Sequence, residues 1–320
     1  MIVTADRKAD KRAQNILEWL YILPTKKNNK ILSGQHGWNN AALIYKETGS
    51  WPAILELSLW NGKAGFNRWP HAKKNREVLK EYWDKGGLVS IHMPVPNPIN
   101  KTSQLDRTNL KDDKISLCLQ EGTVSNNNLN QWLTVFTSHI KWLELNGVIV
   151  FIRPLHEMNG SWFWYGKKDT DIYIKLYKYL FEFLVIKSDL HNILFVYSPS
   201  LMHNNLINYY PGDEYVDIVG ADIYRTPPIR SEDMEAYNLL SSLGKPFAIT
   251  ELGWNSQKNT PAPNTQNAYK DIVLSIKETV PRTVWWNSWT DSRNPALQKE
   301  IKKLYRDPWV ITRDEVNWKK

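Results

Sequence analysis

The residues best suited to chemistry follow an apolar run at positions 148–152. This run contains only valine, isoleucine and phenylalanine, which is typical of a buried strand. It is followed by Arg153, His156 and Glu157, and then by an aromatic segment at positions 162–165. A carboxylic acid at a strand end beside large rings can hold a sugar next to a proton donor, because sugar faces stack on aromatic rings. We therefore predict that Glu157 donates a proton in a sugar-binding site.

A second carboxylate, Glu251, closes another apolar run at positions 246–251. Hydrolysis of a glycosidic bond needs a proton donor and a second carboxylate across the sugar ring. In retaining enzymes the second group attacks the anomeric carbon, and the two carboxyl groups lie roughly 5–5.5 Å apart. The pair Glu157 and Glu251 is predicted to serve these two roles.

The surroundings of the two glutamates predict different pKa values. Burial among rings would raise the pKa of Glu157 and keep it protonated as the acid. Glu251 would stay ionised if Arg153 or Tyr224 donates a hydrogen bond to it. An ionised carboxylate opposite a protonated one is the arrangement that the retaining reaction requires.

Helix-like and strand-like segments alternate along the chain and position these groups. Strands are predicted at residues 31–36, 52–58, 88–92, 148–152, 193–197, 215–220, 246–251 and 283–289. Helices are predicted at residues 10–23, 40–48, 71–85, 129–145, 171–190, 231–243, 265–279 and 298–305. Residues 93–128 are rich in Pro, Asn, Asp and Ser and are predicted to form a long irregular connection, of the kind that is usually functional or mobile.

Eight strands that alternate with helices over roughly 300 residues predict an α/β fold, a closed (β/α)8 TIM barrel. No glycine-rich loop follows the first predicted strand, which disfavours a nucleotide-binding doubly wound sheet. We also find no composition break or linker. The chain is therefore predicted to be a single (β/α)8 catalytic domain over residues 1–320.

The barrel prediction implies an active site at the carboxyl ends of the strands. Nearly every predicted strand ends in a group that can bond a hydroxyl or stack on a ring: His36, Ser58, His92, His156, Glu157, Tyr197, Asp222, Tyr224, Glu251 and Trp289. We expect Trp162 and Trp289 to form stacking walls, and His156 to bond sugar hydroxyls or orient a carboxylate. The remaining histidines are expected to be structural: His71, His139, His191 and His203.

Composition and charge exclude several other classes. The net charge is +8, but the 41 Lys and Arg residues are scattered, which indicates a solvated basic surface and no nucleic-acid partner. No apolar run approaches the roughly 20 residues that span a membrane. Cys118 is the only cysteine, so no internal disulfide is expected. The first eight residues lack the apolar core of a signal peptide; export is our expectation, with a cytoplasmic location left open. We expect a monomer.

Two alternatives from other classes remain open. A metal-dependent barrel hydrolase would use His36, His92, His156 and Asp222 as ligands, but the sequence lacks the closely spaced ligand pair that normally anchors such a site. We therefore expect no metal and no cofactor. A non-catalytic sugar-binding protein would use the same aromatic cleft without needing a carboxylate pair. A single glutamate after a buried strand is about as often an exposed loop residue, but two at strand ends favour catalysis.

The motif RPLHEMNGSWFWYG at residues 153–166 resembles the acid/base motif of glycoside hydrolase family 26, whose commonest members are endo-β-1,4-mannanases. The similarity continues through residues 210–224 and 247–253 and covers nearly the whole chain. The resemblance implies a (β/α)8 barrel and a retaining mechanism without metal, with Glu157 as acid/base and Glu251 as nucleophile. It also implies a set of substrate-binding residues: His92, Arg153, His156, Trp162, Asp222, Tyr224 and Trp289.

Two departures from the family pattern concern the substrate. Residues 55–60 read LELSLW, where an Asp-containing end is expected in mannanases, and residues 290–292 lack the basic residue that some mannanases place there. The family also contains β-1,3:1,4-glucanases and β-1,3-xylanases. We expect a β-linked polysaccharide or oligosaccharide as substrate, with β-1,4-mannan first and the other two glycans as alternatives.

Overall fold

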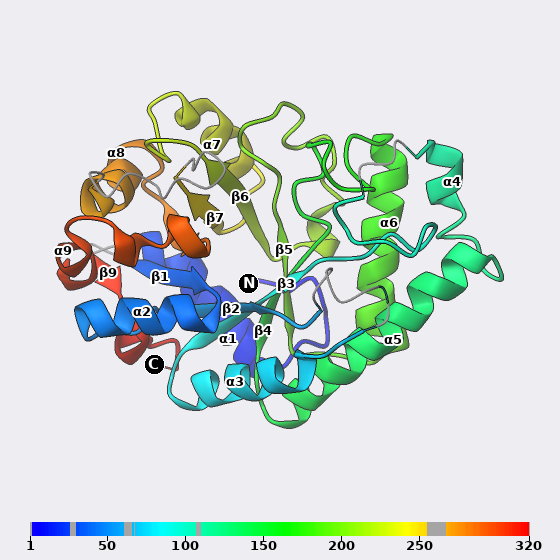
Figure 1. Ribbon diagram of the computed structural model, residues 1–320, viewed down its shortest axis with the longest axis horizontal. Coiled ribbons are helices and arrows are strands. Elements are labelled where there is room, and N and C mark those ends of the chain that lie inside the picture. Colours follow the sequence, from blue (N-terminus) through cyan, green and yellow to red (C-terminus); the bar gives the residue numbers. More distant parts are fainter. Residues whose placement is uncertain are drawn as a thin grey trace.

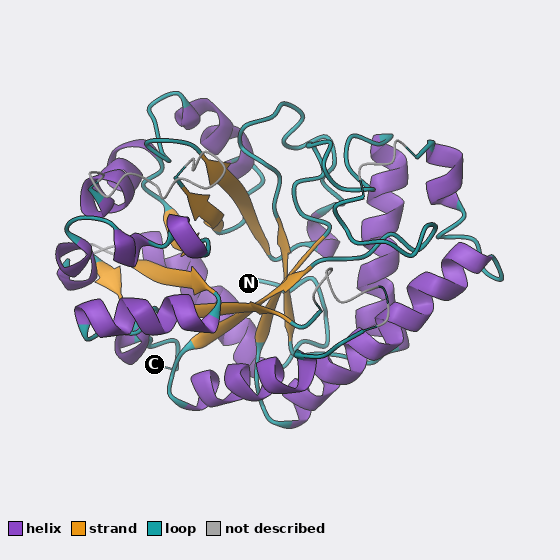
Figure 2. Ribbon diagram, viewed as in Figure 1, coloured by secondary structure: helices purple, strands orange, loops and turns teal. Residues whose placement is uncertain are grey.

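The barrel is closed by eight parallel strands in the computed structural model, which describes residues 2–25, 30–60, 66, 68–106, 110–254 and 267–319 (Figures 1 and 2). The strands are β1 (Ile31–His36), β2 (Ile54–Ser58), β3 (Leu88–Met93), β4 (Val150–Pro154), β5 (Ile193–Tyr197), β6 (Ile218–Tyr224), β7 (Phe247–Gly253) and β8 (Thr283–Ser288). Each pairs with the next in sequence, and pairing of β1 with both β8 and β2 closes the ring. The predicted TIM barrel is confirmed.

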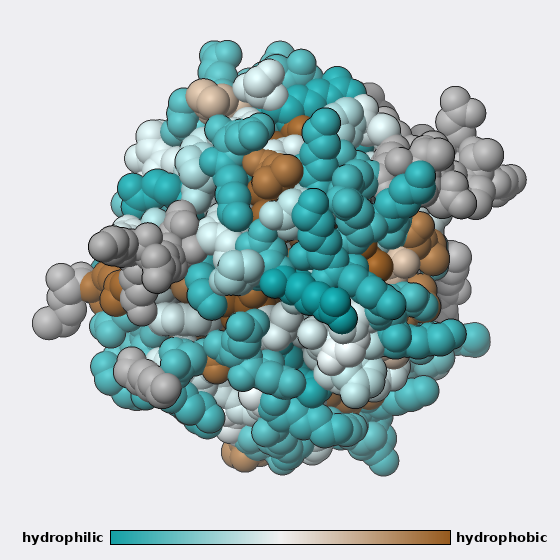
Figure 3. Space-filling model, turned by 90° about the vertical axis from the view of Figure 1, so that its left-hand side faces the viewer, coloured by the Kyte–Doolittle hydropathy of each residue, from teal (hydrophilic) through white to brown (hydrophobic). Residues whose placement is uncertain are grey.

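The helices cover the outside of the barrel (Figure 2). They are α1 (Lys11–Ile22), α2 (Trp38–Thr48), α3 (Ala72–Asp84), α4 (Asp112–Ser116), α5 (Val124–Leu145), α6 (Thr170–Glu182), α7 (Asp233–Ser241), α8 (Ser275–Thr279) and α9 (Ile301–Arg306). No helix among the described residues combines the length and apolar character needed to span a bilayer. On the face shown in Figure 3, hydrophobic residues form small areas separated by hydrophilic ones.

Several predicted boundaries were wrong. Helix α5 begins at Val124, five residues before the predicted start, because the Thr123 hydroxyl caps it by accepting from the backbone N–H of Asn126 at 3.1 Å. Helix α4 and the start of α5 therefore lie inside the stretch predicted to be irregular. The predicted helix 171–190 continues beyond α6 only as a π-helical turn, Phe183–Lys187. The predicted helix 265–279 begins outside the described residues, and its described part contains a second π-helical segment, Tyr269–Leu274.

A short ninth strand, β9 (Val310–Ile311), was not predicted. It pairs in parallel with the first two residues of β1, whereas residues 34–36 of β1 pair with β2. Two residues are too few for an alternating pattern to be recognised in a sequence.

The barrel interior is divided into an apolar half and a polar half. At the amino ends of the strands, inward-facing residues form one cluster with α1: Leu32, Ile54, Leu88, Phe151, Val196, Ile218, Ala248 and Trp285 from the strands, and Ala13, Ile16, Leu17 and Leu20 from the helix. Helix α1 is held there because Arg12 Nη1 donates to the carbonyl of Gly147, just before β4, at 2.6 Å. Polar side chains occupy the other half, at the carboxyl ends of the strands.

Candidate active site

Glu157 lies three residues beyond β4, in a backbone turn that is tightly held. Leu155 and Glu157 both have positive φ angles, +48° and +53°. Such left-handed conformations cost side-chain-bearing residues free energy and are concentrated at functional sites. The backbone N–H of Glu157 donates to the carbonyl of Ser198, just beyond β5, at 2.7 Å. The turn therefore fixes the carboxyl group against the neighbouring strand end.

The surroundings of the Glu157 carboxyl group keep it protonated at neutral pH. Burial and the negative charge of Glu251 raise the pKa of Glu157 to about 8, although the Trp162 hydrogen bond and the charge of Arg153 act in the opposite direction. The indole Nε1 of Trp162 donates to Glu157 Oε2 at 2.7 Å. The direction of the pKa shift is the one predicted from the aromatic segment.

This hydrogen bond gives a pH prediction. A general acid works only while it is protonated, so kcat/KM should fall as the pH rises through about 8. In Trp162→Phe the bond that lowers the pKa of Glu157 is lost, so the basic limb of the pH–rate profile should move to higher pH. Trp289→Phe is the control, because no described bond joins Trp289 to Glu157. An unmoved basic limb in Trp162→Phe would contradict the assignment.

Glu251 faces the barrel interior because β7 contains an irregularity. Ala221 of β6 pairs with Ile249, but the next residue, Asp222, pairs with Glu251, so Thr250 is an extra residue. Such a bulge lets two consecutive side chains point to the same side. Thr250 Oγ1 donates to Asp222 Oδ1 at 2.6 Å, and the Glu251 carboxylate accepts from the buried Arg153, so both side chains point into the barrel.

Two donors hold the Glu251 carboxylate. Arg153 Nη2 donates to Oε1, and the Tyr224 hydroxyl donates to Oε2 at 2.5 Å. Hydrogen bonds from a guanidinium and a phenol stabilise the ionised form of a carboxylate. Both predicted donors are therefore in place.

Arg153 is enclosed by carboxylates and does not face a ligand space. Its side chain is 1% exposed, and Nη1 donates to Asp222 Oδ2 at 2.8 Å while Nη2 bonds Glu251. Burial alone would lower the pKa of Arg153, but the carboxylates outweigh it and raise this pKa well above its ordinary value. Arg153 and Asp222 were predicted to bind substrate; their burial favours a role in holding Glu251.

Asp222 accepts hydrogen bonds from three side chains of the protein. Besides Arg153, it accepts from Ser198 Oγ at 2.8 Å and from Thr250 Oγ1 at 2.6 Å. A buried carboxylate needs several such donors to offset its lost hydration. Asp222 on β6 thus holds the guanidinium of Arg153, which comes from β4, two strands away.

His92 and His156 form a neutral pair beside Glu251. Their Nε2 atoms are 3.2 Å apart, and Nε2 of His156 lies 3.6 Å from Glu251 Oε1. Burial lowers the pKa of both imidazoles well below the ordinary value, and the charge of Arg153 adds to this effect. Nδ1 of His92 bonds Ser58 Oγ at 3.1 Å, which fixes the orientation of its ring.

Trp289 forms one wall of a hollow beside this pair. Its ring lies 4.3 Å from that of His36 at 31°, and 5.8 Å from that of His92, edge to face. The hollow has a volume of about 560 Å³, and its lining also includes Ser58, Trp60, His71, Asn75, Gln104 and Thr290. Rings and polar groups that face one space suit the two faces of a sugar.

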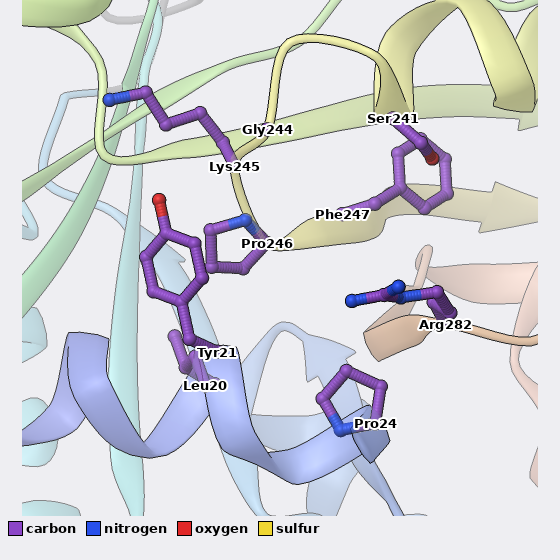
Figure 4. Close-up of a pocket in the computed structure, with 9 residues that line it drawn as sticks. All are labelled: Leu20, Tyr21, Pro24, Ser241, Gly244, Lys245, Pro246, Phe247 and Arg282. Carbon is purple, nitrogen blue, oxygen red and sulfur yellow. The ribbon is translucent and has the colours of Figure 1, made fainter. Parts of the chain in front are cut away.

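A different cavity lies at the opposite end of the barrel. It measures about 240 Å³ and is lined by Leu20, Tyr21, Pro24, Ser241, Gly244, Lys245, Pro246, Phe247 and Arg282 (Figure 4). These residues lie at the end of α7, before or at the amino ends of β7 and β8, and on α1 and the turn that follows it. None of the predicted site residues contributes to this cavity.

The family model described as glycosyl hydrolase family 26 matches residues 5–315. The chain belongs to glycosyl hydrolase family 26. It is therefore a glycoside hydrolase, as the sequence predicts. A mannan endo-1,4-beta-mannosidase of Bacillus subtilis strain 168 is 31% identical to this family-26 chain over 330 residues, which cover 96% of this chain and 87% of that enzyme.

Two further proteins are similar to this chain, one in structure and one in sequence. A solved structure titled as Bacillus subtilis mannanase man26 superimposes with a TM-score of 0.88 and 28% identity, covering 99% of this family-26 chain and 97% of the other. Mannan endo-1,4-beta-mannosidase A and B of Caldalkalibacillus mannanilyticus is 30% identical over 97% of this chain. The match spans 62% of that protein, less than two thirds of its length.

Several residues of this family-26 site were not predicted. Glu56 is a further buried carboxylate beside Arg153, and an acidic residue at an inward position of an apolar strand was its signal. His203, expected to be structural, packs its ring 5.0 Å from that of Trp162. Arg293 lies 5.1 Å above the Tyr224 ring, so a basic residue follows Trp289 after all, one position beyond the segment 290–292.

Only some of the metal ligands proposed from the sequence lie close to one another. Among the described residues, ligand atoms lie within 4.8 Å of one another in two groups: His92, His156 and Glu251, and His156, Glu157 and Asp222. Neither group includes His36. Arg153 contacts both Glu251 and Asp222, so a cation in either group would lie close to a guanidinium charge.

Proposed function

We propose that this family-26 enzyme is a retaining endo-β-1,4-mannanase, with Glu157 as acid/base and Glu251 as nucleophile. The observation that carries the chemistry is the contrast between the two carboxyl groups. Glu157 has a pKa of about 8 in a buried position, whereas Glu251 accepts hydrogen bonds from Arg153 and Tyr224. The choice of mannan rests on the mannan endo-1,4-beta-mannosidases that the chain resembles.

In the first step, Glu157 protonates the leaving glycosidic oxygen while a Glu251 oxygen attacks the anomeric carbon. The bond to the leaving sugar breaks, and a glycosyl ester on Glu251 forms. The Trp162 indole stabilises the Glu157 carboxylate that has given up its proton. In the second step, Glu157 takes a proton from water, whose oxygen attacks the same carbon and releases Glu251.

The substrate is tested with a panel of mannan, glucomannan, mixed-linkage glucan and β-1,3-xylan. We expect new reducing ends to form fastest on mannan, and we expect NMR of the first products to show retained anomeric configuration. Faster cleavage of mixed-linkage glucan or β-1,3-xylan would reassign the substrate within the family. Inverted products would contradict the role of Glu251 as nucleophile.

Chelation separates this proposal from a metal-dependent hydrolase. Because Glu157 and Glu251 supply both the proton and the nucleophile, dialysis against EDTA should leave the rate on mannan unchanged. Loss of activity that a divalent ion restores would favour the metal-dependent alternative. A protein that binds mannan without releasing reducing ends would favour the non-catalytic alternative.

We also propose that the chain acts as one catalytic domain, as a monomer, outside the cell. The side chains of the site come from strands along the whole barrel, from His36 to Trp289, and the hollow is formed within one chain. A polymeric mannan has to be shortened before it can be taken up, which favours export of the enzyme. Sedimentation analysis should show a monomer. Mannanase activity in a culture should be found in the medium and not in the cells.

A further inference from the structure

Glu56, on β2, is a buried carboxylate that the two-glutamate mechanism does not use. Its side chain is 3% exposed. Its Oε1 accepts from Asn287 Nδ2 at 3.0 Å and lies 3.0 Å from His36 Nδ1, while its Oε2 accepts from Ser90 Oγ at 2.8 Å. Asn287 and Ser90 therefore each donate a hydrogen bond to this carboxylate.

The contacts of Glu56 favour its ionised form. Burial raises the pKa of Glu56, but the charge of Arg153 and the bond to His36 outweigh burial and lower this pKa overall. An ionised carboxylate can only accept hydrogen bonds, so the His36 Nδ1 atom must carry the proton of their bond. Glu56 therefore fixes the tautomer and the orientation of the His36 ring.

Glu56 is connected to both halves of the site. On one side, Arg153 Nη2 bonds Glu251 and also lies 3.5 Å from Glu56 Oε1, so the two carboxylates share one guanidinium nitrogen. On the other side, the His36 ring packs at 4.3 Å on the ring of Trp289, which lines the hollow. The same carboxylate oxygen, Oε1, makes both connections.

We propose that Glu56 is a positioning residue that links the aromatic wall of the hollow to the nucleophile. Glu56 holds the His36 ring and thereby positions the Trp289 ring that packs on it. Glu56 and Glu251 both contact Arg153 Nη2, so Glu56 also positions the guanidinium group beside Glu251. This inference rests on the proposed function. The proposed coupling is between the position of the sugar and the position of the Glu251 carboxylate, because Glu56 contacts the residues that hold each of them.

The test is steady-state kinetics of Glu56→Gln on a mannan oligosaccharide. Glutamine has nearly the same size but carries no charge and only one acceptor oxygen, so the contacts with His36 and Arg153 lose the negative charge that strengthens them. We expect kcat to fall by about 10- to 100-fold, because a small displacement of a reacting group can lower the rate by this much. We expect KM to rise several-fold. Glu56→Asp keeps the charge and should recover part of kcat.

The matched control is Asp217→Asn, the same acid-to-amide change at another buried site. Asp217 accepts from the backbone N–H groups of Ala5 and Phe195 at 2.7 and 2.8 Å, before the amino end of β6 and away from the reacting groups. This variant should lower the thermal midpoint without changing kcat or KM of the folded enzyme. A purely structural role of Glu56 would give the same result for Glu56→Gln and would overturn the proposal.

If Glu56→Gln does not fold, His36→Gln and Glu56→Asp give the answer. His36→Gln breaks the connection to the wall and changes the lining of the hollow but leaves the contact of Glu56 with Arg153, so KM should rise more than kcat falls. Equal kinetics of both variants and wild type would overturn the proposal. A wild-type enzyme that is inactive on every glycan would defeat the proposed function instead, whereas an active wild type with an indifferent Glu56→Gln defeats only the coupling.

Discussion

Glu251→Ala is expected to lower kcat on mannan by roughly 10⁴-fold or more, because Glu251 is the group that we propose forms the covalent intermediate. In the structure, Glu251 is the carboxylate that both Arg153 and Tyr224 hold, and its carboxyl group contributes to the raised pKa of Glu157. Removal should therefore abolish the nucleophile and also lower the pKa of Glu157. The rate is measured by release of reducing ends with purified, folded variant.

The control for this loss is Glu144→Ala. Glu144 accepts from the backbone N–H of His191 at 2.6 Å, near the amino end of β5, and its removal should leave kcat unchanged. Circular dichroism should show that both variants are folded. If Glu251→Ala keeps a tenth of the wild-type rate, Glu251 is not the nucleophile.

Glu157→Ala should lower kcat/KM on mannan by about 10²- to 10⁴-fold, the usual contribution of a general acid. The loss should be much smaller for an aryl mannoside whose phenolate leaves without a proton. The basic limb near pH 8 should also disappear, because the group with a pKa of about 8 has been removed.

Rescue by azide distinguishes this role from general damage to the site. In Glu157→Ala the glycosyl ester on Glu251 should be hydrolysed slowly, because Glu157 is no longer present to take a proton from the attacking water. Azide needs no base, so it should restore turnover of the aryl substrate and give a mannosyl azide of retained configuration. If mannan and the aryl mannoside lose activity equally and azide has no effect, Glu157 is not the acid/base residue.

The strands were predictable because each is a short apolar run closed by polar residues. Residues 193–197 form β5 with the predicted bounds, and residues 31–36 form β1 likewise. The same runs identified the strand ends, and with them most of the site. Helix ends were less predictable, because caps and π-turns depend on single contacts such as that of Thr123 with Asn126.

Within the site, pairwise contacts across the barrel were not predictable. The sequence indicates that Arg153 is near the two glutamates, but not that it is enclosed by Asp222, Glu251 and Glu56. Likewise, His203 appears in the sequence as an ordinary loop residue. Its position against Trp162 depends on how the loop after β5 folds over the turn at Glu157, which no local pattern encodes.

The irregular pairing at Thr250 has a consequence for protein engineering. In a regular strand, residue 251 would point outward, towards the helices, because residue 249 packs there in the large core cluster. A designer who copies the segment 247–253 onto an idealised barrel strand would thus obtain a Glu251, the proposed nucleophile, that faces the helices. The transferable unit is the glutamate together with its extra residue and the matching register on β6.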